Sequence, residues 1–94
     1  MELTPELREQ VRLSLLRYGL APAGFTLGLG RAYLKSEGFR QLTIDQVQAE
    51  IDYLDHPQKG FLEATNKRIS PEVAIYRTTP NGLDYLAQQR EERA

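Results

Sequence analysis

Cysteine is absent from the 94 residues, and histidine occurs once. The lack of thiols excludes disulfides and cysteine-ligated zinc, so packing alone must hold the fold, which fits a reducing cytoplasm. The single His56, between Asp55 and Pro57, is too little for a catalytic dyad or a metal site. No apolar run approaches the roughly 18 residues of a membrane helix, and residues 1–6 lack the features of a signal peptide. We therefore expect a cytoplasmic protein without cofactor and without membrane contact.

Motifs for phosphate cradling and nucleophilic catalysis are also lacking. Gly24, Gly28 and Gly30 form a glycine-rich stretch, but no strand is expected before it and no Gly-Lys-Ser/Thr follows it. The serines stand in no nucleophile motif. We therefore do not expect an enzyme.

The composition is that of one small globular domain spanning residues 1–94. Hydrophobic residues make up 40% of the chain and charged residues 27%, which is too apolar for a disordered protein. The net charge is −1 and the sequence pI is about 5.8. The overall charge is therefore not that of a strongly basic nucleic-acid binder.

Capping signals and apolar spacing predict three helices in the first part of the chain. The first begins with Thr4 as cap and Pro5 at the first helical position, and the second runs from about residue 28 to 37. The third begins at Thr43, where Gln46 gives capping-box spacing, and ends at His56-Pro57. The side chains expected to face inward from these helices are Leu7, Val11, Leu15, Tyr18, Leu29, Tyr33, Leu34, Ile44, Val47, Ile51 and Leu54.

After Gly60 the apolar period changes from helical to alternating. Residues 61–65 and 73–78 are predicted strands, with a turn over residues 66–72. Thr79-Pro80 then repeats the cap-plus-proline signal of a helix, although Asn81-Gly82 could instead form a hairpin turn. The last helix is expected to pack through Leu83, Leu86 and Ala87. We expect the charged tail, residues 88–94, to fray.

The predicted fold class is therefore α+β, mainly α, in the order of a winged helix-turn-helix: three helices, a two-stranded β-wing and a C-terminal helix. The segments 51–54 and 60–62 resemble the passage from a recognition helix into the first wing strand, and residues 76–86 resemble the second wing strand entering the last helix. The order of elements over residues 5–88 is similar to that of small winged-helix proteins of bacteria and Mu-like prophages. The resemblance implies a DNA-binding regulator of transcription, although winged helices also serve as protein-binding modules.

Two positions depart from the pattern of those regulators. Five residues, 55–59, separate Leu54 from Gly60, where such proteins usually have about three. Thr78 stands where leucine is more usual.

The predicted third helix argues against DNA binding by its charge. Residues 43–55 contain no Lys or Arg and four acids: Asp45, Glu50, Asp52 and Asp55. Duplex DNA carries one phosphate charge per ~1.7 Å of axis, and its neutralisation dominates affinity. A helix with this charge therefore enters the DNA field at a disadvantage.

Cations elsewhere offer compensation for a double-stranded DNA partner. Arg31, Lys35 and Arg40 lie on or just after the second helix, which crosses the phosphates in this motif. Lys67 and Arg68 lie at the expected tip of the wing. The candidate nucleic-acid contacts are Arg31, Lys35, Arg40, Thr43, Gln46, Tyr53, Lys67 and Arg68.

The alternative function is a protein-interaction module that does not bind DNA. Its acidic third helix would dock on a basic partner. A homodimer through Leu13, Leu16 and Tyr85 is also expected, unless these side chains pack against the domain's own helices. Salt-dependent affinity for duplex DNA distinguishes the two functions.

Overall fold

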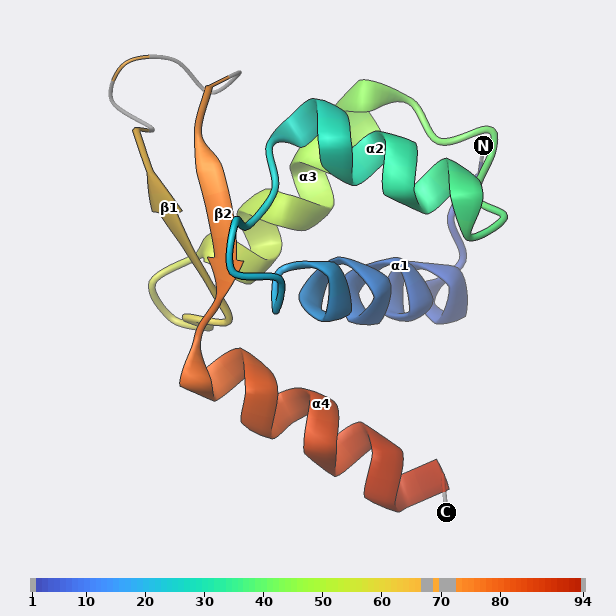
Figure 1. Cartoon of the computed structure of the whole chain (residues 1–94). Coiled ribbons are helices and arrows are strands. Elements are labelled where there is room, and N and C mark those ends of the chain that lie inside the picture. Colours follow the sequence, from blue (N-terminus) through green and yellow to red (C-terminus); the bar gives the residue numbers. More distant parts are fainter. Residues whose placement is uncertain (1, 67–68, 70–72, 94) are drawn as a thin grey trace.

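The computed structural model is α+β and mainly helical, and it describes residues 2–66, 69 and 73–93, with the side chains of 90–93 left aside. Three helices come first: α1 (Pro5–Tyr18), α2 (Leu27–Ser36) and α3 (Ile44–Asp55). An antiparallel ribbon of β1 (Leu62–Thr65) and β2 (Ile75–Thr78) follows, and then α4 (Pro80–Arg93). Figure 1 shows the ribbon standing beside the three helices, with α4 running below α1.

The helix boundaries follow from the capping signals. Thr4 accepts the Leu7 amide and Pro5 opens α1, while Thr43 and Gln46 form the complete capping box of α3. His56 has left the helical conformation (ψ 136°), because the following proline disfavours it. The predicted caps of α1 and α3 are therefore confirmed.

The second helix begins one residue earlier than predicted, and its inward face also differs from the predicted one. Thr26 caps it by accepting the Leu29 amide, so α2 begins at Leu27. Gly30 then faces the core, where an added Cβ would lie 3.2 Å from the Phe25 ring. Leu34 is fully buried, but Leu29 is half exposed, so the prediction that Leu29 faces inward was wrong.

The core lies where α1, α2, α3 and the ribbon meet. Its buried hydrophobic side chains are Val11, Leu13, Leu15, Leu16, Phe25, Leu34, Leu42, Val47, Ile51, Leu54, Leu62, Ala74, Tyr76 and Leu86. Burial of a leucine- or valine-sized side chain stabilises a fold by roughly 1.5–3 kcal/mol, so this cluster supplies the main driving force. Packing replaces the missing disulfides.

Leu13 and Leu16 belong to this core and not to a surface. The alternative expectation, that they pack against the domain's own helices, is confirmed for these two side chains, because α1 is covered on two sides by the chain itself. Tyr85, the third residue assigned to that contact, is half-buried against Phe61, with ring centroids 4.8 Å apart.

Backbone hydrogen bonds join the α1–α2 connection to the ribbon, and a glycine permits this close approach. Phe25 and Tyr76 exchange two backbone hydrogen bonds (2.9 and 2.8 Å), which adds a single bridge to the edge of β2. Gly24 precedes this bridge at φ +68°, and an added Cβ would lie 2.5 Å from the Tyr76 carbonyl oxygen. Only glycine fits this close approach.

The two departures from the regulator pattern have local explanations. The long connection after Leu54 closes on itself, since the Gly60 and Lys59 amides donate to the His56 carbonyl and the Phe61 amide donates to that of Leu54. At position 78 the threonine hydroxyl donates to the Leu16 carbonyl at 2.6 Å, which satisfies a free acceptor near the end of α1. Leucine could not make this bond.

The last helix confirms one prediction and corrects another. Thr79 accepts the Gly82 amide and caps α4, so Asn81-Gly82 lies in a helix and is not a hairpin turn. Leu86 is buried, but Leu83 and Ala87 are exposed, contrary to the expected packing face. The helix extends to Arg93, through the segment that we expected to fray.

Candidate nucleic-acid interface

Helix α3 has three adjacent stripes, each defined by residues three and four positions apart. Val47, Ile51 and Leu54 form the inward stripe and are fully buried, as predicted. Ile44, expected to join them, is 37% exposed because it lies in the first turn, beyond the packed part of the helix. The core assignment is therefore confirmed for three of the four residues.

The acidic stripe consists of Asp45, Ala49 and Asp52, all exposed. Asp52 accepts a hydrogen bond from the Gln48 amide group at 2.8 Å, one turn earlier in the same helix. Ala49 lies between the two carboxylates and leaves a shallow gap in the stripe. This face presents negative charge to any ligand.

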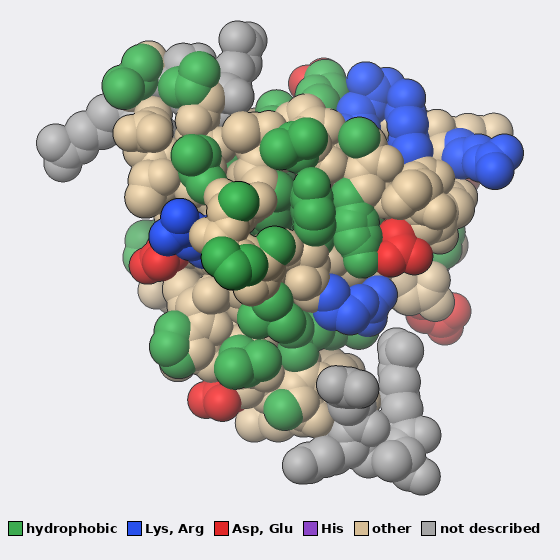
Figure 2. Space-filling view, in the orientation of Figure 1, with side chains coloured by type: hydrophobic (Ala, Val, Ile, Leu, Met, Phe, Trp, Pro, Cys, Tyr) green, Lys and Arg blue, Asp and Glu red, His purple; other side chains and the backbone are tan. Residues whose placement is uncertain are grey.

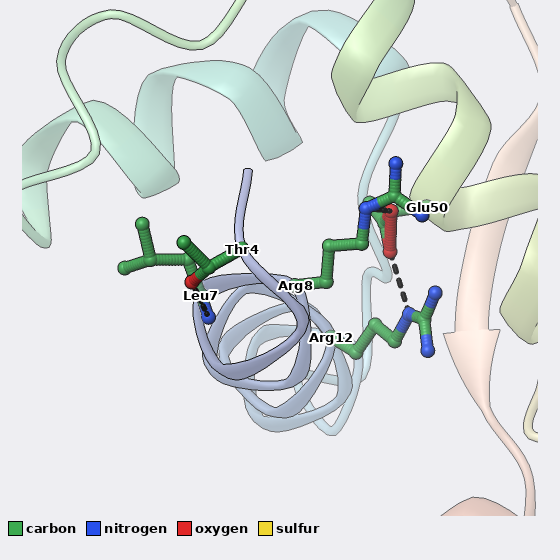
Figure 3. Close-up of polar contacts among 5 residues, drawn as sticks. All are labelled: Thr4, Leu7, Arg8, Arg12 and Glu50. Atoms are coloured by element: carbon green, nitrogen blue, oxygen red, sulfur yellow. Dashed lines mark hydrogen bonds and ion pairs between the residues drawn. The ribbon is translucent and has the colours of Figure 1, made fainter. Parts of the chain in front are cut away.

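The α1-side stripe consists of Gln46, Glu50 and Tyr53, and its chemistry differs. Glu50 is only 4% exposed, and its Oε2 lies 2.6 Å from the Nε of Arg12 on α1. The Nε of Arg8 lies 4.0 Å from the other carboxylate oxygen. Figure 3 shows the Glu50 carboxylate between the two guanidinium groups. One of the four predicted acids of this helix is therefore turned inward and neutralised.

Two cations lie near the Tyr53 ring on the α1 side of α3. The Arg12 guanidinium carbon lies 3.6 Å from the centroid of the Tyr53 ring, and the Lys59 ammonium lies 5.2 Å from it. Both distances are in the range of cation–π attraction. Tyr53 remains 38% exposed, in keeping with its prediction as a contact residue.

Tyr85 of α4 borders the α1-side stripe. Its hydroxyl donates to Glu9 of α1. Burial raises the pKa of the Tyr85 phenol, and the hydrogen bond to the Glu9 carboxylate raises the pKa further. The phenol therefore stays protonated and keeps α4 attached to α1.

The cations predicted to cross the DNA phosphates lie together on α2 and its following loop. Lys35 and Arg40 are exposed, and Arg31 is partly exposed with a buried Nε that has no hydrogen-bond partner. Among the described residues, no carboxylate oxygen lies within 4.0 Å of a basic nitrogen of these three side chains. Figure 2 shows Lys and Arg side chains grouped over α2 and the segment that follows it.

Two predicted contacts already have structural roles. The Thr43 hydroxyl accepts the Gln46 amide, and the Gln46 side-chain oxygen accepts the Thr43 amide. Their oxygens are therefore committed to the cap of α3, and a Gln46 contact to adenine would break this cap. Lys67 and Arg68, predicted at the tip of the wing, lie outside the described residues.

Sequence reasoning missed Glu50, Arg8, Arg12 and Lys59 as members of one surface. A signal was present, because Arg8 and Arg12 lie one turn apart on α1 and Glu50 directly precedes the buried Ile51. Knowing that these elements meet, however, requires the packing of α1 on α3.

Other chemistry finds little support in the described parts of the chain. An apolar hollow of about 470 Å³ lies between α1 and α4, where Arg17 is the only charged lining residue. No group of three or more His, Asp or Glu side chains among the described residues could hold a metal ion. No helix in the described ranges is long and apolar enough to cross a membrane.

Comparisons with known proteins add no relative: no family model, no curated protein and no solved structure matches this chain.

Proposed function

We propose that this chain is a winged-helix domain that binds duplex DNA, as a small regulator linked to transcription. The order of elements supports the fold assignment. An α2–loop–α3 unit is followed by an antiparallel ribbon and a closing helix, and the Phe25–Tyr76 bridge joins the ribbon to the helical part. In such domains α3 is the helix that approaches the bases.

The observation that carries the proposal is the group of cations on α2 and its loop, which have no carboxylate partner among the residues that the structure describes. Arg31, Lys35 and Arg40 come from the element that crosses the backbone in a helix-turn-helix. Charges that are not neutralised by neighbouring carboxylates remain available to displace counterions from phosphates.

The charge of α3 is a smaller obstacle than its sequence indicates. Glu50 is buried and paired with Arg12, so the outward acids of its two ligand-facing stripes are Asp45 and Asp52. Aspartate can accept from the cytosine amino group, and Ala49 can contact a thymine methyl. The helix supplies selectivity, while the cations of α2 supply attraction.

The test is a titration of labelled duplex DNA at several salt concentrations with single variants. Lys35→Gln and Arg40→Gln should each weaken binding uniformly across sequences and reduce the salt slope by about 0.9, the value for one phosphate contact. Arg17→Gln is the matched control, because Arg17 is an exposed cation beside the α1–α4 hollow. Unchanged slopes in both test variants, or an equal loss in the control, would overturn the assignment of these cations.

The acidic stripe favours one second candidate, a module that docks on a basic protein partner. Asp45 and Asp52 are exposed on one face and repel phosphate, but they attract lysine and arginine. Absence of duplex binding at low salt, together with loss of partner binding in Asp45→Asn/Asp52→Asn, would favour this function over DNA binding.

A further inference from the structure

The α1-side stripe of α3 carries more positive than negative charge. Arg8 and Arg12 lie against one carboxylate, Glu50, and Lys59 lies near the Tyr53 ring on which Arg12 stacks, so these three cations and Glu50 carry a formal charge of +2. The Glu9 carboxylate, which accepts the Tyr85 hydroxyl, offsets one of these charges and leaves a net charge of +1. A helix that is acidic by sequence therefore has one basic side.

Glu50 faces the Nε atoms of both arginines and holds Arg12 by a hydrogen bond. The Arg12 Nε lies 2.6 Å and the Arg8 Nε 4.0 Å from the two oxygens of this carboxylate. In Figure 3 the terminal nitrogens of Arg12 point away from Glu50. A guanidinium has five N–H donors, so an Nε contact leaves the terminal donors available to a second anion.

The aromatic ring of Tyr53 contacts Arg12 and Lys59. Arg12 stacks on this ring at 3.6 Å and Lys59 lies 5.2 Å from the same centroid, so both cations border the same aromatic ring. The exposed fractions of the Arg8 and Arg12 side chains are 55% and 18%. Arg8 is therefore open to a ligand, while Arg12 is held between Glu50 and Tyr53. A cation that is already positioned loses less side-chain entropy when it binds an anion.

We propose that Arg8, Arg12 and Lys59 form a phosphate-binding site beside Tyr53. Phosphate is the matching chemistry because the guanidinium fork offers two parallel donors and the ammonium adds a point charge. In the DNA complex, which rests on the proposed function, this site holds a backbone phosphate next to α3. The contact is supplied by α1 and the turn after α3, independently of the cations of α2.

The first experiment uses inorganic pyrophosphate as the probe and amide and arginine Nε NMR signals as the readout. At low ionic strength, saturable shifts should centre on Tyr53, Lys59 and Arg12. Arg8→Gln/Lys59→Gln should weaken this binding at least about tenfold, since it removes two charged donors to the anion. Arg17→Gln/Arg77→Gln is the charge-matched control, since both residues are exposed elsewhere. Non-saturable shifts in the wild type, or equal weakening in the control, would overturn the site.

The second experiment repeats the duplex titration with the same two double variants. Loss of two phosphate contacts should reduce the salt slope by about 1.8 in Arg8→Gln/Lys59→Gln. If pyrophosphate binds at the site but duplex DNA does not bind the wild type, the proposed function fails and the site stands for small phosphorylated ligands. If duplex binding depends on Lys35 and Arg40 but not on Arg8 and Lys59, the function stands and the DNA role of this site fails.

Discussion

The acidic stripe and the α1-side stripe lie next to each other on α3, but their surroundings give them opposite electrostatic character. Asp45 and Asp52 face solvent, and Asp52 accepts a hydrogen bond from Gln48 of the same helix. Glu50 belongs to the neighbouring α1-side stripe and is buried between two arginines of α1. The charge of a helix surface therefore depends on which neighbouring element covers each stripe.

The comparison also separates two energetic roles for carboxylates. An exposed carboxylate contributes little to stability because water screens it, whereas a buried one must be paired. Glu50 joins α3 to α1, while Asp45 and Asp52 are available for a ligand. Both outer stripes depend on the packing of the inward stripe.

The largest expected effect concerns the inward stripe of α3. Ile51→Ala should lower the free energy of unfolding by about 2–5 kcal/mol, because Ile51 is fully buried and its truncation leaves a cavity. The same change at Ile44, which is 37% exposed, should cost about 1 kcal/mol or less. Urea unfolding measures both values. Equal losses would mean that the two isoleucines share one face, and the stripes would have to be redrawn.

Arg12→Ala should lower the unfolding free energy by about 2 kcal/mol, because it removes the main partner of the buried Glu50 carboxylate. This value lies below that of a fully buried pair, since the Arg12 side chain is 18% exposed and Arg8 remains nearby. Asp52→Ala on the acidic stripe is the control and should change stability by less than about 0.5 kcal/mol. A double-mutant cycle with Glu50→Ala should recover part of the loss. Without such coupling, the ion pair does not join the two helices.

Gln46→Ala and Gln48→Ala compare one residue type at two places on α3. Gln46 completes the capping box, so its loss should cost about 0.5–1 kcal/mol. Gln48 only donates to the exposed Asp52, and its replacement should be nearly neutral. Thermal unfolding followed by circular dichroism resolves the difference. A larger loss for Gln48 would contradict the assignment of Gln46 to the capping box.

The smallest effect concerns Tyr85, which borders the α1-side stripe. The folded-state pKa of its phenol is raised above the ordinary value, so the folded state holds this proton more tightly than the unfolded chain. The resulting stability is present below about pH 10, the usual tyrosine pKa, and is lost as the pH rises further. Urea unfolding at about pH 8 and pH 11 should therefore show a decline that is smaller in Tyr85→Phe than in the wild type. An identical decline in Tyr85→Phe would exclude Tyr85 as its source.

Much of the local structure could be predicted from short-range rules. Thr4-Pro5, Thr43 with Gln46, and Thr79-Pro80 begin their helices as expected, because capping depends on residues only three positions apart. The change to alternating spacing after Gly60 gave the position of the ribbon within one or two residues. The exposed Tyr53 and the cations of α2 could also be named from periodicity alone.

The inward and outward faces were less predictable at the helix ends. Leu29 and Leu83 have apolar side chains at plausible helical positions, but both are substantially exposed. A helical wheel assumes a neighbour along the whole length of the helix, whereas α2 turns Gly30 toward Phe25 and buries Leu34. Conversely, the sequence offered Leu13 and Leu16 as contacts for a partner, but both side chains are buried by the domain's own helices.

By itself, the sequence determined where the helices begin, to within one residue, and where the ribbon lies, since caps, turns and periodicity act over a few residues. The tertiary structure alone decided that Arg8 and Arg12 meet Glu50, whose Arg12 hydrogen bond spans 38 positions. It also decided that Lys59 lies beside Tyr53 and that Thr78 caps the end of α1. The physical reason is that the effective charge of a carboxylate depends on burial and on partners from distant segments, which local patterns do not specify.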